Sequence, residues 1–277
     1  MKLSPQRIAT FRKKIYGHYR KHGRKLPWRT TQNSYRILVS EVMLQQTQVD
    51  RVRQKYVEFL HAFPTFSALS KAQLPEVLRV WQGLGYNRRA LALKRSADEV
   101  MTRYKGRLPR TLSELKTLPG IGPYTAGAIM AFAFNKPAVI IETNIRSVYI
   151  HEFFPKSEQV SDRELLPLIE QTLDQKNPRT WYFALMDYGA HLKKTRVNPS
   201  RNSTGYKKQS SFAGSNRQVR GTILKLLTQH AALSEKSLVR LSEFSKDRVQ
   251  QNLIALQREG FLKKKNNTFL LCLSLSK

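Results

Sequence analysis

The chain of 277 residues carries 49 Lys and Arg against 19 Asp and Glu, a formal net charge of +30 with a pI of about 10.5. This excess of positive charge favours a polyanionic partner, with nucleic acid the first candidate and a membrane surface the alternative. No run of eighteen apolar residues predicts a membrane span, and the first residues lack the apolar core of a secretion signal, so we expect an intracellular protein, cytoplasmic and nucleoid-associated if bacterial.

Basic residues gather in two stretches that lack acids. Eleven Lys and Arg precede the first acid, Glu41, and nine lie between Asp187 and Glu235. A run of charge is often only a solvated face, but two such stretches in one chain favour contacts with phosphates.

Helical signals dominate the first 195 residues. Residues 4–23 predict a helix with Ser4 as N-cap, Pro5 in the first turn and Gly23 as its stop. Further helices are predicted at 34–63 (one helix or two), 67–82, 88–106, 111–118, 122–135, 144–154, 161–174 and 178–192. No strand is predicted before residue 255, so residues 1–195 predict an all-α domain of short helices.

The composition changes after Lys194. Residues 196–214 are rich in Ser, Asn, Gly and Lys and predict a basic linker. Residues 215–277 predict three helices, with Ser234 and Ser245 as N-caps of the second and third, and then a hairpin at 261–275 with an Asn-Asn turn. This order is typical of a winged-helix domain, which serves DNA contact or, alternatively, protein contact.

A glycine-containing hairpin joins two predicted helices in "LPGIGPYTAGAI", residues 118–129. Gly120 and Gly122 allow a close approach of the backbone, and the N–H groups that open the next helix make an anion site suited to a phosphodiester. This is the helix-hairpin-helix element, which binds DNA phosphates without reading sequence.

Together with other stretches, this hairpin resembles the helix-hairpin-helix DNA glycosylases, most closely the MutY-like adenine DNA glycosylases. The supporting stretches are "LPWR" at 26–29, "SEVMLQQTQV" at 40–49, "WQGLGYNRRALAL" at 81–93, the hairpin itself and "ALMDYGA" at 184–190. The resemblance covers roughly residues 10–195. It implies a mostly α fold, with a bilobal glycosylase domain at 1–195 followed by the small winged-helix-like α+β domain.

Removal of a base from deoxyribose requires protonation of the departing base and stabilisation of an oxocarbenium-like sugar, which two carboxyl groups in different environments supply. Glu142 precedes a predicted helix whose dipole favours the ionised form. The resemblance implies that it stabilises the sugar cation, at a position where the family has aspartate. The alternative is an acid that only caps the helix.

Glu41 is the second acid, and it lies within an apolar run that predicts burial. Burial raises the pKa of a carboxyl group and would leave it protonated and able to donate. The resemblance implies that Glu41 protonates the adenine ring, whereas the alternative is an acid on the solvated edge of its helix.

Two further positions bear on the chemistry. Tyr124 stands where bifunctional relatives carry the lysine that forms a Schiff base, so the resemblance implies a monofunctional enzyme in which water completes the reaction. Asn144 is implied to orient the carboxylate or the water, or else only caps the helix.

The resemblance also implies residues that contact DNA. Gln46 and Tyr86 match positions that wedge into the base stack, with plain polar surface as the alternative, and Trp28 and Arg29 match the edge of the base pocket. The remaining DNA-binding residues are Gly120, Gly122, Thr125, Lys193 and Lys194.

The chain departs from the family pattern in two places. Relatives follow the "ALMDYGA" helix with four cysteines that hold an iron–sulfur cluster, but the chain's one cysteine is Cys272. We therefore expect no cluster, no metal and no other cofactor, with Lys193, Lys194 and Arg196 supplying phosphate contacts instead. The winged-helix-like domain stands where fuller relatives carry a β-rich domain that recognises 8-oxoguanine.

The sequence therefore predicts a monomeric, monofunctional DNA glycosylase that removes adenine mispaired with guanine or 8-oxoguanine from double-stranded DNA. Two alternatives stay open: excision of thymine or uracil opposite guanine, and a DNA-binding protein whose glycosylase site is degenerate.

Overall fold

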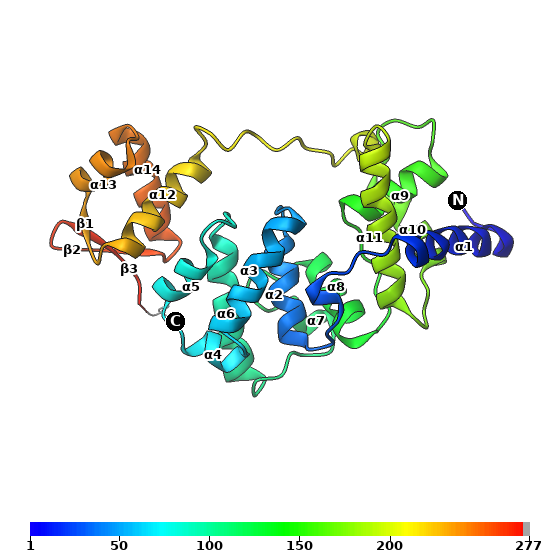
Figure 1. The fold of residues 1–277 in the computed structure, drawn as a ribbon, viewed down its shortest axis with the longest axis horizontal. Helices are drawn as coiled ribbons and strands as arrows, with labels where there is room; N and C mark the ends of the chain where they lie inside the picture. The colour runs from blue at the N-terminus through cyan, green and yellow to red at the C-terminus, as the bar shows by residue number, and fades with distance from the viewer. Residues whose placement is uncertain (274–277) are drawn as a thin grey trace. The chain divides into compact units, whose positions relative to one another are not determined.

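The computed structural model describes residues 1–273 and is mostly helical with one small sheet, as predicted (Figure 1). Its contacts divide the chain into two units. The first unit comprises Met1–Leu38, Arg110–Thr117 and Ile121–Lys208, and the second comprises the remaining residues. Helix α2, Ser34–Leu44, runs across the division. None of the helices in the described part of the chain is long and apolar enough to cross a membrane.

The regular elements of the first unit are helices, joined by loops, two of which meet in an isolated β-bridge between Val160 and Ser203. Its helices are α1 Pro5–His22, η1 Pro27–Arg29, α7 Leu112–Leu115, α8 Pro123–Phe134, α9 Thr143–Phe153, α10 Asp162–Thr172, α11 Pro178–Thr195 and η2 Pro199–Asn202. Ser4 caps α1 by accepting a hydrogen bond from the backbone N–H of Arg7, and Gly23 ends it, as predicted.

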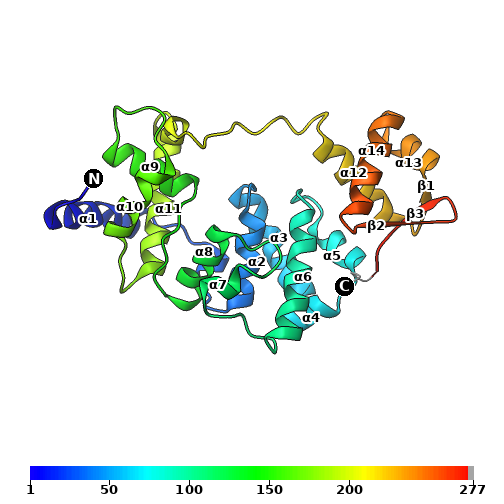
Figure 2. The same cartoon turned by 180° about the vertical axis from the view of Figure 1, so that it is seen from behind.

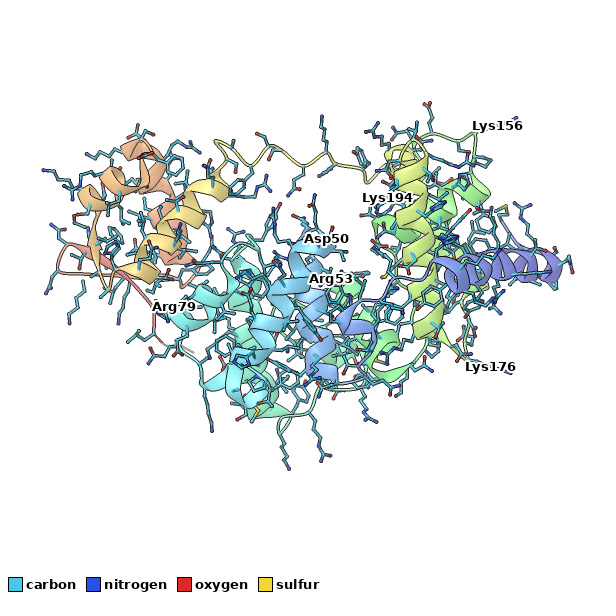
Figure 3. The ribbon with its side chains drawn as sticks, in the orientation of Figure 1. Asp50, Arg53, Arg79, Lys156, Lys176 and Lys194 are labelled. Atoms are coloured by element: carbon cyan, nitrogen blue, oxygen red, sulfur yellow. The ribbon has the colours of Figure 1, made fainter. Side chains whose placement is uncertain are left out.

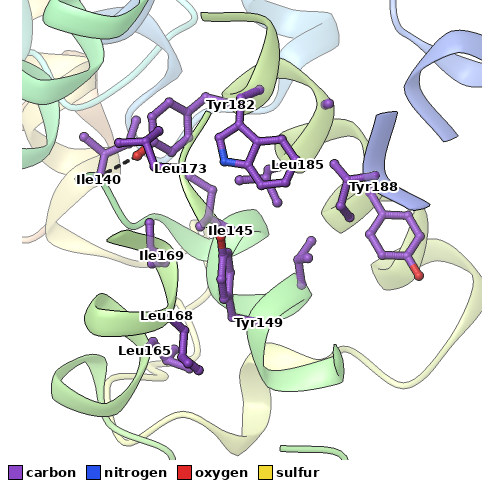
Figure 4. Close-up of a cluster of buried hydrophobic side chains, with 14 of the residues drawn as sticks. Ile140, Ile145, Tyr149, Leu165, Leu168, Ile169, Leu173, Tyr182, Leu185 and Tyr188 are labelled. Atoms are coloured by element: carbon purple, nitrogen blue, oxygen red, sulfur yellow. Dashed lines mark hydrogen bonds between the residues drawn. The ribbon is translucent and has the colours of Figure 1, made fainter. Parts of the chain in front are cut away.

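Helices α9 and α11 lie side by side in both views of the ribbon (Figures 1 and 2), and their apolar faces form a large part of the core of the first unit. Figure 4 shows Tyr149 of α9 near Tyr182 and Leu185 of α11, with α10 covering the same cluster. Trp181, Tyr149 and Tyr182 are fully buried. Burial of such large apolar surfaces stabilises the packing of α9 on α11 by several kcal/mol, at roughly 25 cal/mol per Å².

The second unit combines a helical part with a small α+β module. The helical part contains α3 Val49–Ala62, α4 Phe66–Lys71, α5 Leu74–Trp81 and α6 Arg88–Arg103. The C-terminal module contains α12 Asn216–Gln229, β1 Leu233–Ser234, α13 Glu235–Ser242, α14 Lys246–Arg258, β2 Leu262–Lys265 and β3 Thr268–Leu271. The predicted hairpin is confirmed as β2 and β3, with positive φ at both Asn266 and Asn267 of its turn. Residues 274–275 of the predicted hairpin lie outside the described residues.

The C-terminal module packs against α5 and α6 of the same unit. Glu259 accepts hydrogen bonds from Arg88 at 2.6 and 2.8 Å and from Arg220 at 2.5 Å. The amide of Gln82 donates to Thr228 at 2.8 Å. Burial alone would raise the pKa of Glu259, but its hydrogen bonds with the two arginines lower it. The module is therefore an integral part of the second unit.

Three predicted elements differ from the structure. The predicted helix 67–82 is two helices, α4 and α5, because Ala72 is extended between them. The expectation of no strand before residue 255 is wrong, since β1 pairs with β3 and makes the sheet three-stranded in the order β1-β3-β2. A two-residue strand has no sequence period from which it could be recognised.

Part of the predicted linker 196–214 is packed. Helix η2 contacts α9, and Ser200 is buried. The backbone N–H of Val160 donates to the carbonyl of Asn202 at 2.8 Å, and that of Thr204 donates back to Val160 at 3.1 Å. This segment therefore belongs to the first unit.

Candidate active site

The segment that leads to Glu142 is clamped on two sides. The hydroxyl of Tyr182 donates to the carbonyl of Ala138 at 2.6 Å and accepts from the N–H of Ile140 at 3.3 Å (Figure 4). On α8, a Cβ atom at Gly127 would come within 3 Å of the Ile140 side chain. The segment can lie this close to α8 only because residue 127 has no side chain.

Glu142 is the N-cap of α9. Its Oε1 accepts hydrogen bonds from the backbone N–H groups of Asn144 at 2.8 Å and Ile145 at 3.0 Å, and its Oε2 accepts from the Asn144 amide at 3.1 Å. These donors and the positive end of the helix dipole stabilise negative charge on the carboxylate. The structure thus brings Glu142 and Asn144 together, and both the capping role and the catalytic role remain compatible with this geometry.

Helix α11 packs closely against the start of α9. A Cβ atom at Gly189 would come within 3 Å of the carbonyl and side chain of Asn144. One turn further on the same face, Lys193 is half-buried. Burial lowers the pKa of Lys193, the charge of Glu142 opposes this shift, and Arg146 adds to it. Lys193 therefore lies in the electrostatic field of Glu142, whereas Lys194 is exposed at the last turn of α11 (Figure 3).

Substitution of Gly189 by Ala is expected to displace the start of α9, because the nearest atoms are the carbonyl and the Cβ of Asn144, which cannot rotate away. Overpacking of this kind lowers the free energy of unfolding by about 1–3 kcal/mol. Urea denaturation measures the effect. The control is Gly17→Ala in α1, where the nearest atom to the new Cβ is 3.9 Å away and alanine should stabilise the helix by about 1 kcal/mol. Equal midpoints for the two variants would contradict the close contact.

Glu41 lies in α2 and belongs to the second unit, whereas Glu142 belongs to the first. The residue is only 6% exposed, and its neighbours Ser40 and Val42 are also buried. This burial agrees with the predicted environment and does not fit the alternative of an acid on a solvated edge.

Arg89 of α6 connects the loops that carry Gln46 and Tyr86, and sequence reasoning did not identify it. Its two terminal nitrogens donate to the carbonyls of Val42, Met43, Gln45, Leu84 and Gly85 and to the hydroxyl of Thr47, at 2.5–3.1 Å. The residue is only 9% exposed, and burial lowers the pKa of its guanidinium to about 10. The available sequence signal was an arginine at an inward-facing position of an amphipathic helix, in "NRRALAL".

Both predicted wedge residues adopt the left-handed backbone conformation. The φ angle is +54° at Gln46 and +47° at Tyr86, which is unusual for residues other than glycine. Gln46 is exposed and Tyr86 is half-buried. Arg89 donates hydrogen bonds to residues that flank Gln46 and Tyr86, and these bonds hold both loops in place.

The predicted hairpin has the expected backbone. Gly120 has a φ of +75°, and a Cβ there would lie 2.6 Å from that of Ala92 on α6. Gly122 is the N-cap of α8, is exposed, and has nothing within 4 Å of the position of a Cβ. Two α8 residues follow, Tyr124 half-buried and Thr125 buried.

Arg29 is engaged by an acid of α11. Its guanidinium donates two hydrogen bonds of 2.8 Å to the carboxylate of Asp187, which also accepts from Arg24. Burial alone would raise the pKa of Asp187, but the two arginines lower it. Trp28 beside it is buried. The structure thus gives Arg29 a role in fixing η1 on α11, which sequence reasoning did not foresee.

No group of three or more His, Cys, Asp or Glu that could hold a metal ion occurs within residues 1–273. The thiol of Cys272 is half-buried, and burial raises its pKa.

Residues 39–171 match the family described as HhH-GPD superfamily base excision DNA repair protein. The adenine DNA glycosylase of Mycolicibacterium smegmatis is 35% identical over 245 residues, which are 82% of this chain and 81% of that protein. The adenine DNA glycosylase of Buchnera aphidicola subsp. Baizongia pistaciae is 36% identical over 65% of this chain. The match covers only 52% of the length of that protein. The human adenine DNA glycosylase is also 36% identical, over 66% of this chain and only 36% of its own length.

Solved structures show the same fold. A thermostable thymine-DNA glycosylase superposes with a TM-score of 0.61 at 28% identity, covering 69% of this chain and 89% of its own. An endonuclease III in a non-covalent complex with DNA superposes with a TM-score of 0.57 at 18% identity, over 67% and 85% of the two chains.

Proposed function

The chain belongs to the HhH-GPD superfamily of base excision DNA repair proteins, and from this premise we propose that it is a monofunctional DNA glycosylase. The proposed reaction is hydrolysis of the N-glycosidic bond of an adenine mispaired with guanine or 8-oxoguanine in double-stranded DNA, after the base has flipped out. The observation that carries the proposal is the carboxylate of Glu142, fixed at the start of α9 by three hydrogen bonds. The names of the similar adenine DNA glycosylases support the choice of base.

Glu142 is the proposed electrostatic partner, or transient nucleophile, of the sugar cation. Glutamate is one methylene longer than the aspartate implied by the family pattern. Its side chain folds back onto the N–H groups of Asn144 and Ile145, and this takes up the additional length. Asn144, bonded to the other carboxylate oxygen, orients the group.

Glu41 is the proposed general acid for the departing base. Its side chain is only 6% exposed, and in this proposal it holds the proton that passes to the base. Tyr124, in place of a lysine, gives no amine for a Schiff base, so the proposed product is an abasic site in an uncut strand.

The enzyme is proposed to work as a monomer. It is also proposed to work without an iron–sulfur cluster, because such a cluster takes four cysteine ligands and this chain has Cys272 alone. Lys193 and Lys194 at the end of α11 are proposed to contact phosphates in its place. The exposed Gly120 and Gly122 of the hairpin complete the proposed phosphate contacts.

The C-terminal module is proposed to be a second surface for the DNA backbone. A recess of about 660 Å³ in this module is lined by four bases and one acid: Lys236, Arg240, Lys246, Lys264 and Glu235. The exposed turn of the β2–β3 hairpin borders it through Asn267. This charge favours a polyanion over the alternative of a protein partner.

Replacement of both Lys246 and Lys264 with Ala is expected to make DNA binding less dependent on salt. Loss of two phosphate contacts reduces the slope of log K against log salt by about 1.8. Fluorescence anisotropy at several salt concentrations measures the slope. The control pair Lys156→Ala and Lys176→Ala removes the same charge from exposed sites of the first unit, labelled in Figure 3. Equal slopes for the two double variants would exclude the recess as a DNA site.

A strand-cleavage assay tests the proposed function. Duplexes with A opposite 8-oxoguanine, A opposite G, and T or U opposite G are incubated with the protein and then treated with hot alkali. Nicks that appear only after alkali, on the adenine strand, are expected. Nicks on the T or U strand would favour the second candidate, which the likeness to a thymine-DNA glycosylase supports. Cutting without alkali would contradict the role of Tyr124, and loss of excision with retained binding in Glu41→Gln would identify the acid.

A further inference from the structure

The side chain of Tyr86 is held by the C-terminal module. Arg217, in the first turn of α12, donates a hydrogen bond from Nη1 to the Tyr86 hydroxyl at 2.8 Å, and its guanidinium carbon lies 5.3 Å from the ring centroid. The amide of Gln209 donates to the same hydroxyl. The other terminal nitrogen of Arg217 donates to the carbonyl of Ser210 at 2.7 Å. Arg217 is thus fixed at one end and holds Tyr86 at the other.

A second guanidinium contacts the same ring. The Arg89 guanidinium carbon lies 5.4 Å from the centroid of Tyr86, within the range of a cation–π interaction. Arg89 holds the loop backbone through the carbonyls of Leu84 and Gly85. Arg89 therefore fixes where the loop lies, and Arg217 fixes where the hydroxyl end of the ring points.

The orientation of Tyr86 carries backbone strain. Its φ of +47° is disfavoured for a bulky residue, and such a conformation persists only where surrounding contacts determine it. The module that supplies Arg217 is itself anchored to the helical part by the ion pair between Glu259 and Arg88 of α6, while Arg220 of α12 pairs with Glu259 within the module. The Tyr86 ring is thus held by a residue of α12, and α12 belongs to a module that is itself attached to the helical part of the second unit.

We infer that Arg217 is a positioning residue for the DNA wedge: it presets the Tyr86 ring for insertion beside the extruded base, so that the C-terminal module contributes to base flipping. The inference rests on the proposed function, in which Tyr86 enters the base stack. Preorganisation of the ring lowers the entropic cost of ordering it on DNA. The opposite arrangement, in which Arg217 restrains Tyr86 and releases it on binding, predicts faster extrusion when the contact is lost.

The test compares Arg217→Met with Arg217→Lys and Tyr86→Phe. Single-turnover excision gives the rate, and 2-aminopurine placed next to the target adenine reports extrusion by its fluorescence. We expect Arg217→Met to lower both the rate and the fluorescence rise about tenfold. Arg217→Lys should retain part of the excision rate and of the fluorescence rise, because lysine keeps the charge and a hydrogen-bond donor but not the planar group. Lys225→Met, which removes one charge from an exposed site of the same helix, should match the wild type.

The double variant Tyr86→Phe with Arg217→Met decides whether the two residues act together. If they do, it should be no worse than the poorer single variant, since the hydrogen bond can be lost only once. Additive losses, an unchanged rate in Arg217→Met, or faster extrusion would each overturn the inference while the glycosylase activity stood. Absence of excision by the wild-type protein on every duplex would instead refute the proposed function, and the inference with it. If Arg217→Met does not fold, Arg217→Lys and Tyr86→Phe provide the comparison.

Discussion

Replacement of Glu142 with Gln is expected to slow excision by roughly 10²–10⁴-fold, the range found when a charged catalytic group is removed. The amide is nearly isosteric, and its oxygen can still accept the hydrogen bonds from the N–H groups of Asn144 and Ile145. The helix cap is therefore kept, while the negative charge that we propose to face the sugar is lost. Single-turnover kinetics on the duplex cut fastest by the wild-type protein measure the change.

The variant Glu142→Asp is the matched comparison, because it keeps the charge and shortens the side chain by one methylene. It should remain well above Glu142→Gln in rate. Duplex affinity should differ less than about twofold among the three proteins, since Glu142 is not one of the proposed phosphate contacts. Full activity in Glu142→Gln would show that another residue carries the chemistry.

Replacement of Arg89 with Met is expected to lower the free energy of unfolding by about 3–5 kcal/mol, the magnitude found when one partner of a buried charged network is removed. Five backbone carbonyls and the hydroxyl of Thr47 would lose the hydrogen bond that Arg89 donates to each of them. The turns that carry Gln46 and Tyr86 would then lose the group that joins them. Urea denaturation measures stability, and hydrogen exchange shows whether both turns open.

A control on the same helix separates burial from charge. Arg103 of α6 is exposed and pairs with Glu99 four residues earlier. Arg103→Met should change stability by less than about 1 kcal/mol, as for other exposed ion pairs. Equal unfolding midpoints for Arg89→Met and wild-type protein would contradict the network described here.

Local signals in the sequence predicted much of this fold correctly. Ser4 and Gly23 delimit α1, Asn266 and Asn267 form the hairpin turn, and Glu142 begins α9. Each of these depends on residues a few positions apart, where propensity and capping act directly.

The sequence did not reveal contacts between residues distant along the chain. Arg89 reaches carbonyls 44–47 residues earlier, and Arg217 reaches Tyr86 across 131 residues. Periodicity shows which face of a helix is buried, but it does not show which loop that face meets. Gly189 lies within the motif at 184–190, but only the structure shows why a glycine is needed there: the carbonyl of Asn144 lies directly against it.

Glu259, Thr228 and Leu273 of the C-terminal segment contact the region of α5 and α6. These contacts limit how the C-terminal segment can be removed or exchanged. A protein truncated after residue 208 would lack α12, which packs on α5, and would lack Glu259, which forms an ion pair with Arg88. The shortened product should accumulate in inclusion bodies rather than behave as a smaller repair enzyme. In the same way, an exchange of C-terminal segments between relatives would succeed only if the matching residues of α5 and α6 were transplanted together with them.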